Sequence, residues 1–185
     1  MKLAVFFSGI GYHCDKPLLY FTRELVKQVG FDEIINLSYA CQADNVRGNN
    51  RKMREVGEIL YGQAERSLAE VDFTQYDEIL FVSKSIGTAV AAAYAMRHQV
   101  ICKNIWYTPL AQTFDFKPHD GIAFTGTADP WVETDVIRAR CAEARIPLYE
   151  YENANHSLEV GDTLENLRIL ENVIMRSREY LQSLE

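Results

Sequence analysis

Three short polar segments supply a serine, a carboxylate and an imidazole, in that order along the chain. They span Ser83–Gly87, Gly126–Pro130 and Asn155–Ser157, and each follows an apolar run typical of a strand. The carboxyl ends of parallel strands share one edge of a sheet, so side chains from these segments can converge there. A hydroxyl, a carboxylate and an imidazole in this order are the groups that nucleophilic acyl transfer requires.

Ser85 is the candidate nucleophile. It follows the strand predicted over 78–82 and precedes a predicted helix, in the pattern Ser-x-Ser-x-Gly. A nucleophile on a sharp strand-to-helix turn needs small residues two positions before and after it, and Ser83 and Gly87 meet that need. Ser83 itself fits less well, because Phe81 would stand two positions before it. The alternative is that Ser85 only caps a helix.

The candidate acid and base lie in loops after two later strands. Asp129 follows the strand predicted over 121–125, and the neighbouring Trp131 can shield it from water. The alternative is that Asp129 only opens the next helix, as Asp-Pro often does. His156 lies in a polar loop after the strand predicted over 148–151, from which it can bridge an acid and a serine. The alternative for His156 is a surface histidine without a role.

The loop after the first strand, Ser8–Tyr12, contains two glycines. Glycines there let a backbone N–H point at a developing oxyanion. A phosphate-binding loop is the rival interpretation, but the pattern G-x-G-x-x-G is missing and no Walker lysine follows. Residues in loops at the same edge are expected to line a substrate pocket; they are Tyr12, His13, Thr108, Pro109, Leu110 and Trp131.

Strands and helices alternate along the whole chain. We expect strands over 3–7, 33–37, 78–82, 104–107, 121–125 and 148–151, and helices over 17–29, 46–71, 87–98, 133–144 and 162–181. Asp15 is the expected N-cap of the first helix and Asp162 that of the last. The stretch 108–120 shows no clear element and is expected to help form the pocket. The alternation predicts an α/β fold over residues 1–185 as a single domain, a three-layer α/β/α sandwich with a mainly parallel six-stranded sheet.

The charge balance disfavours binding to nucleic acid or to an anionic membrane. Nineteen Lys and Arg against 26 Asp and Glu give a net charge of −7. Phosphate binding needs clustered cations. One small basic cluster exists, and we interpret it as a solvated helix face; its members are Arg47, Arg51, Lys52 and Arg54.

The cysteines and the first residues favour a reducing cytoplasmic location. The four cysteines are far apart and form no Cys-x-x-Cys pair, so neither a disulfide scaffold nor a zinc site is predicted. The apolar run at 3–7 is too short for the core of a signal peptide or for a membrane span.

The chain resembles the α/β-hydrolase superfamily. The resemblance rests on V-S-K-S-I-G at 82–87, F-T-G-T-A-D-P-W at 124–131 and N-A-N-H-S-L-E at 153–159, and on the order of strands and helices over nearly the whole chain. The chain looks like a compact member with a minimal form of the fold. Such a member starts at the strand that usually comes third and has neither the usual first two strands nor a lid domain.

This resemblance implies a role for each candidate residue. Ser85 would be the nucleophile, Asp129 the acid of the triad and His156 the base. The oxyanion donors would be the backbone N–H groups of Ile86 and Ile10.

The sequence departs from the family pattern in two places. Ser83 stands where the nucleophile turn usually opens with glycine, although a small residue still fits. Ser8-Gly9 stands where the oxyanion loop often carries His-Gly, which leaves Gly11 and Tyr12 as alternatives to Ile10.

We therefore expect a cytoplasmic serine hydrolase of the carboxylesterase or thioesterase type. It would act on a small acyl substrate through an acyl-enzyme, without a metal or organic cofactor, as a monomer or homodimer. One alternative is a catalytically silent module of the same fold that binds a ligand or a protein. Another is a flavodoxin-like protein that binds a nucleotide or flavin.

Overall fold

The computed structural model describes residues 1–41 and 46–183. Within these residues six strands form one sheet, in the order β2-β1-β3-β4-β5-β6, and every neighbouring pair is parallel. The strands are β1 (Lys2–Phe7), β2 (Glu33–Leu37), β3 (Glu78–Lys84), β4 (Lys103–Tyr107), β5 (Gly121–Gly126) and β6 (Leu148–Tyr151). All six predicted strands are thus confirmed, and the sheet is parallel throughout.

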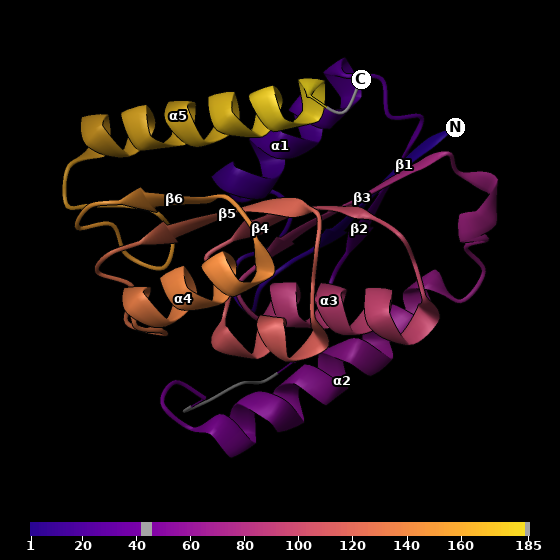
Figure 1. Cartoon of the computed structure of the whole chain (residues 1–185), viewed down its shortest axis with the longest axis horizontal. Coiled ribbons are helices and arrows are strands. Elements are labelled where there is room, and N and C mark those ends of the chain that lie inside the picture. The colour runs from indigo at the N-terminus through magenta and orange to yellow at the C-terminus, as the bar shows by residue number, and fades with distance from the viewer. Residues whose placement is uncertain (42–45, 184–185) are drawn as a thin grey trace.

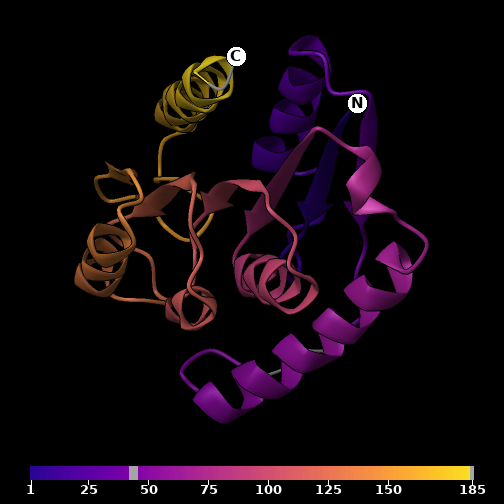
Figure 2. The same ribbon diagram turned by 45° about the vertical axis from the view of Figure 1, so that its right-hand side comes forward.

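Helices cover both faces of this sheet. The described part of the chain forms α1 (Pro17–Gln28), α2 (Asn50–Leu68), α3 (Ile86–His98), α4 (Thr134–Ala144) and α5 (Thr163–Gln182), with short 3-10 helices η1 (Phe73–Gln75) and η2 (Ala111–Phe116). Helices α1 and α5 lie side by side on one face, and α2, α3 and α4 lie on the other (Figures 1 and 2). The predicted three-layer α/β/α architecture is confirmed. Among the described residues, no helix has both the length and the apolarity that crossing a membrane requires.

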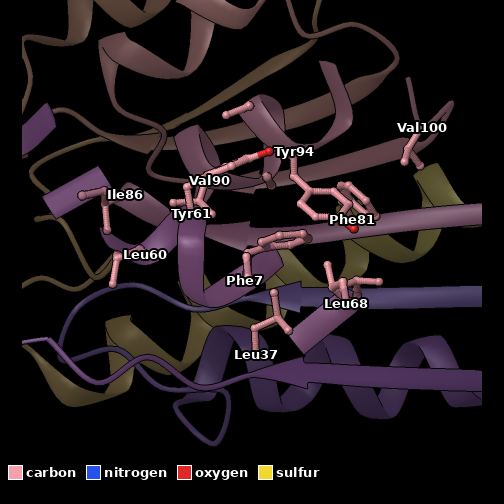
Figure 3. Close-up of a cluster of buried hydrophobic side chains, with 14 of the residues drawn as sticks. Phe7, Leu37, Leu60, Tyr61, Leu68, Phe81, Ile86, Val90, Tyr94 and Val100 are labelled. Carbon is pink, nitrogen blue, oxygen red and sulfur yellow. The ribbon is translucent and has the colours of Figure 1, made fainter. Parts of the chain in front are cut away.

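The core lies on both sides of the sheet because successive side chains of a strand point to opposite faces. In β1, Leu3, Val5 and Phe7 belong to the cluster beneath α2 and α3. The alternate residues Ala4 and Phe6 belong to the cluster beneath α1 and α5. Figure 3 shows the first cluster, in which Phe7 packs against Phe81 of β3 at a ring-centroid separation of 4.9 Å.

The order of the strands determines where a site can form. From β1 the chain first turns outward to β2, and all later strands lie on the other side of β1. In open parallel sheets, ligands bind at the carboxyl ends of the strands where the order reverses. That point lies between β1 and β3, and the loops that leave it are Ser8–Tyr12 and the turn at Ser85.

Of the two expected helix N-caps, one is wrong and the other is confirmed. Asp15 was expected to cap the first helix, but Lys16 occupies the cap position and makes no side-chain cap hydrogen bond. Asp15 instead pairs with Arg23 of α1, at 3.0 Å. The expected cap of the last helix is confirmed, since the Asp162 side chain accepts a hydrogen bond from the Glu165 amide.

The long helix expected over 46–71 is shorter at both ends. Gly48 has a φ of +75°, which is outside the helical range. The Asn49 side chain then accepts a hydrogen bond from the Lys52 amide at 3.0 Å, so the helix begins after Asn49 and ends at Leu68. Three of the four residues of the predicted basic cluster on this segment are exposed, which agrees with a solvated face.

The segment 108–120, expected to lack regular structure, contains η2. Thr113 of η2 is fully buried, and its hydroxyl lies 2.6 Å from that of Thr88 on α3. This contact attaches the segment to the start of α3.

We predict that Gly87→Ala destabilises the fold by about 2 kcal/mol or more, as overpacking in a rigid environment does. A Cβ at this position would overlap the carbonyl oxygens of Phe7 and Ser8, which are backbone atoms that cannot move aside cheaply. Urea denaturation measures the change. The matched control is Gly62→Ala in α2, where a Cβ meets only the Arg66 side chain at 3.7 Å. That variant should be neutral or stabilising by up to about 1 kcal/mol. An equal loss of the free energy of unfolding in the two variants would contradict the prediction.

Candidate active site

Ser85 lies in a strained turn between β3 and α3. Its φ of +57° with ψ of −129° is a conformation that residues other than glycine rarely adopt. Such a conformation costs on the order of 1–3 kcal/mol and persists only where the surroundings hold it. Here the Ser85 amide donates to the Tyr107 carbonyl at 3.0 Å, and the Ser85 carbonyl accepts from the amide and the hydroxyl of Thr88. The helix-cap alternative is not supported, because the Ser85 side chain makes no cap hydrogen bond.

The three side chains singled out in the sequence form a continuous chain of hydrogen bonds. Asp129 Oδ2 lies 2.6 Å from His156 Nδ1, and His156 Nε2 lies 2.7 Å from Ser85 Oγ. An ionised carboxylate can only accept, so the proton of a neutral imidazole belongs on Nδ1. Nε2 is then free to accept the proton of the Ser85 hydroxyl.

The Asp129 side chain is buried, and each of its two carboxylate oxygens accepts a hydrogen bond. Its side chain has no exposed surface, against 15% for that of His156. The second carboxylate oxygen, Oδ1, accepts from the Trp131 amide at 2.8 Å. The Trp131 ring lies beside the His156 ring, with 5.4 Å between the two ring centroids. The helix-start alternative for Asp129 is wrong, because α4 begins only at Thr134.

The loops that carry Asp129 and His156 are joined by backbone hydrogen bonds. The Thr127 amide donates to the Tyr151 carbonyl, and the Ala128 amide to the Ala154 carbonyl, both at 3.0 Å. A Cβ at Gly126 would overlap the Ala154 carbonyl, so only glycine allows this approach. The distance between the acid and the imidazole is therefore set by main-chain contacts between two adjacent loops.

A buried lysine that the sequence analysis did not single out holds the histidine loop. Lys84 is only 1% exposed, and its Nζ donates to the His156 carbonyl at 2.7 Å and to Thr108 Oγ1 at 2.6 Å. Thr108 Oγ1 donates in turn to the His156 carbonyl at 3.1 Å. The Tyr12 ring lies 5.0 Å from the ammonium group. One signal was available: a charged residue directly after five apolar or small residues of a predicted buried strand.

Burial shifts the pKa of both cationic groups downward. It lowers the pKa of Lys84 to about 7, against the opposing attraction of the Asp129 and Glu159 carboxylates. Burial is also the largest cause of the lowered pKa of His156. The hydrogen bond from Asp129 opposes that shift, and the charge of Lys84 adds to it. His156 is therefore neutral at neutral pH, as a proton acceptor must be.

The two residues whose amides are expected to bind an oxyanion, Ile10 and Ile86, line the same cavity as Ser85. In residues 1–41 and 46–183, neither the Ile86 amide nor the Ile10 amide donates a hydrogen bond to another protein group. Ile10 lies in a tight loop closed by hydrogen bonds between Gly9 and Tyr12. A Cβ at Gly9 would stand 3.2 Å from the Ser85 Cβ, so the loop lies directly against the serine.

A cavity of about 210 Å³ opens in front of Ser85 and His156. Of the residues expected to contact substrate, Tyr12, Leu110 and Trp131 line this cavity. His13 does not, because its side chain is 63% exposed and turned toward Asp15. Thr108 does not either, because it is fully buried beneath the His156 loop. Both belonged to the correct loops, but the direction of a loop side chain depends on tertiary packing.

Comparison with known proteins identifies solved structures that share this fold. No protein-family model and no curated protein sequence matches the chain. Solved structures do match it. A protein of the α/β-hydrolase superfamily from Xanthomonas campestris pv. campestris has a TM-score of 0.66 at 15% identity, with 98% of each chain covered.

Two further structures show the same likeness. An α/β serine hydrolase without a lid from Xanthomonas campestris has a TM-score of 0.62 at 16% identity, with 99% of this chain and 82% of that chain covered. An esterase from Pyrococcus furiosus has a TM-score of 0.63 at 11% identity, with 98% and 83% covered. The expected resemblance is thus confirmed at the level of architecture: the chain has the α/β-hydrolase fold.

Proposed function

We propose that the protein is a serine hydrolase that cleaves a carboxylic ester or thioester through an acyl-enzyme intermediate. The observation that carries this proposal is the hydrogen-bond chain from Asp129 through His156 to Ser85, with distances of 2.6 and 2.7 Å. Its position at the carboxyl edge of the sheet, where the strand order reverses, supports the same conclusion. The esterases and hydrolases among the structural neighbours are consistent with it.

In the proposed acylation step, His156 Nε2 takes the proton of the Ser85 hydroxyl as Oγ attacks the acyl carbonyl. A tetrahedral oxyanion forms, and the Ile86 and Ile10 amides donate hydrogen bonds to it. One such donor contributes about 3–4 kcal/mol of transition-state stabilisation in a known serine protease. His156 then gives its proton to the departing alcohol or thiol, which leaves the acyl group on Ser85.

In the proposed deacylation step, water takes the place of the leaving group. His156 accepts a proton from the water as its oxygen attacks the acyl carbon and a second tetrahedral intermediate forms. The bond between the acyl carbon and Ser85 Oγ then breaks, His156 returns the proton to Oγ, and the carboxylic acid is released. Asp129 holds the imidazole in the tautomer that leaves Nε2 unprotonated, and it stabilises the imidazolium that forms in each step.

Lys84 is a positioning residue in this scheme. Its ammonium group binds the His156 carbonyl directly and also through Thr108, so it holds the ring toward Ser85. Its charge also favours the neutral form of His156.

A fluorophosphonate probe tests the nucleophile. We expect covalent labelling of the native protein at Ser85 and loss of labelling in Ser85→Ala, because no other hydroxyl lies within hydrogen-bond distance of His156 Nε2 in the described residues. Mass spectrometry of the labelled peptide measures this.

The matched control is Ser83→Ala, which removes a buried hydroxyl without a hydrogen-bond partner two positions away. This variant should still be labelled, and its stability should be unchanged or raised. A folded native protein that the probe does not modify would contradict the proposal and favour a binding module of the same fold.

The pH dependence of kcat/KM tests the base. Activity requires neutral His156, and burial lowers its pKa, so more acid than usual is needed to protonate it. We therefore expect activity to fall on acidification, with a midpoint below the usual histidine value of about 6.5. Steady-state kinetics with a short ester measures the profile. Activity that stays constant from pH 8 to about pH 4 would exclude a histidine base.

Lys84→Met separates positioning from stability. We expect kcat to fall at least about tenfold, because the hydrogen bonds that hold the His156 loop are lost. The acid limb of the pH profile should move to higher pH, since the cation that lowers the pKa of His156 is gone. The free energy of unfolding should be unchanged or larger, because a buried charge is replaced by an apolar side chain.

The control for this variant is Lys103→Met, the same replacement at a partly exposed lysine paired with Asp120 at 3.1 Å. It should alter stability by less than about 1 kcal/mol and leave kcat unchanged. An unshifted pH profile in Lys84→Met would mean that Lys84 is only structural.

A further inference from the structure

A second cavity, of about 400 Å³, adjoins the one in front of Ser85. The two share three lining residues, Met53 of α2, Ile86 of α3 and Leu110 before η2. The second cavity therefore begins where the first ends, directly beside the candidate nucleophile. Its size lies in the range of roughly 300–1,000 Å³ that is usual for small-molecule sites.

This second cavity is a groove that follows α3. Its wall on that helix consists of Ile86, Ala89, Val90, Ala93 and Arg97, which are spaced three or four residues apart and so share one helix face. At 1.5 Å per residue, the groove extends for about 16 Å along the helix.

The opposite wall comes from α2. Met53 stands at the end near Ser85, and Gly57 and Tyr61 follow at four-residue intervals on the same face. Figure 3 shows Ile86, Val90 and Tyr61 together where the two helices meet. The groove therefore leads from Ser85 outward between α2 and α3.

Small residues keep the groove open. Gly57 on one wall and Ala89 and Ala93 on the other leave room where larger side chains would let the helices close together. A Cβ built at Gly57 meets no atom within 4 Å. This glycine borders empty space, whereas Gly87 has no room for a Cβ at all.

The far end of the groove carries balanced charge. Arg97 pairs with Glu58 at 3.0 Å and lies 4.1 Å from the centre of the Tyr61 ring. Apolar side chains line the inner part, next to Ser85. Arg54 and Asp115 also line the groove, so two cationic and two anionic side chains balance there. The groove thus has no excess of positive charge to bind a terminal anion, and its apolar inner part suits an uncharged hydrocarbon chain.

We propose that this groove binds the acyl chain of the substrate, an aliphatic chain of medium length. The inference rests on the proposed hydrolase function. The leaving group must lie beside His156, which has to protonate it. His156 and Trp131 line only the first cavity, whereas the groove starts from the opposite part, at Met53, Ile86 and Leu110. A chain in the groove is therefore attached to the acyl carbon, and the site accepts longer acyl groups than the small acyl substrate expected from the sequence.

Chain-length selectivity tests this inference. We expect kcat/KM for p-nitrophenyl octanoate to exceed that for the acetate ester by at least about tenfold, because each buried methylene adds to transition-state binding. Gly57→Leu should lower kcat/KM for the octanoate at least about tenfold and leave the acetate within about twofold, because its side chain fills the groove beyond the acetyl site.

The matched control is Gly62→Leu, the same replacement in the same helix but outside the groove. It should leave kcat/KM unchanged for both the octanoate and the acetate ester. Both replacements favour the helix. Should Gly57→Leu fail to fold, Ala89→Leu fills the groove from the other wall.

Several results would overturn the inference. One is a native protein that prefers acetate; another is a Gly57→Leu variant that loses both activities equally. A preference for octyl acetate over ethyl octanoate would place the chain on the alcohol side instead.

If neither ester is hydrolysed, the proposed function has failed, and calorimetry with octanoate then decides the inference separately. Binding by the native protein that is lost in Gly57→Leu would support a site for an aliphatic chain, and no binding by the native protein would overturn it.

Discussion

The strained turn at Ser85 is the constraint on which the rest of the site depends. A φ of +57° at a residue with a side chain is unfavourable, and hydrogen bonds to Tyr107 and Thr88 hold it in place. The turn also brings the start of α3 against the end of β1, so closely that only glycine fits at position 87. Because of this approach, the loop after β1 lies directly against Ser85, and Ile10 and Ile86 line the same cavity as its side chain. The position of the serine and that of its possible oxyanion donors are thus consequences of a single backbone arrangement.

The same turn places a cation in the protein interior. Lys84 is the last residue of β3, and its buried ammonium group donates a hydrogen bond to the His156 carbonyl. The Trp131 ring contacts the imidazole ring of His156. Burying an ammonium group is costly, and an apolar side chain of similar volume would favour stability. The hydrogen bonds to the His156 carbonyl and to Thr108 offset part of this cost. Thr108, a β-branched residue with a φ of +45°, is strained as well. A strained residue, Thr108, and a buried cation, Lys84, therefore both contact the His156 loop. Strained residues are common where a side chain must be held in one orientation.

One helix pair contributes to the core and also forms the walls of the proposed acyl-chain groove. The inner faces of α2 and α3 contribute Leu60, Tyr94 and Val90 to the core, packed over β1 and β3. Along the groove the facing residues Gly57, Ala89 and Ala93 are small, and the helices leave a channel between them. The channel needs no lid, because its walls are already elements of the sandwich. Its depth is set by side-chain volume at Gly57, Ala89 and Ala93, so substrate selectivity can change without a change of fold.

Local patterns in the sequence were enough to identify the strands and the three candidate side chains. A run such as 3–7, apolar at every position, is typical of a strand buried on both faces of a parallel sheet, and the carboxyl ends of such strands meet at one edge. The sequence could not show that Asp129, His156 and Ser85 lie within hydrogen-bond distance, since this depends on contacts between distant loops. Nor could it show which way loop side chains point: His13 turns to solvent and Thr108 to the interior. The contacts of Lys84 and the groove at Gly57 also required the tertiary structure. The place of Lys84 after an apolar run was its only signal in the sequence, and empty space between helices is a property of packed elements.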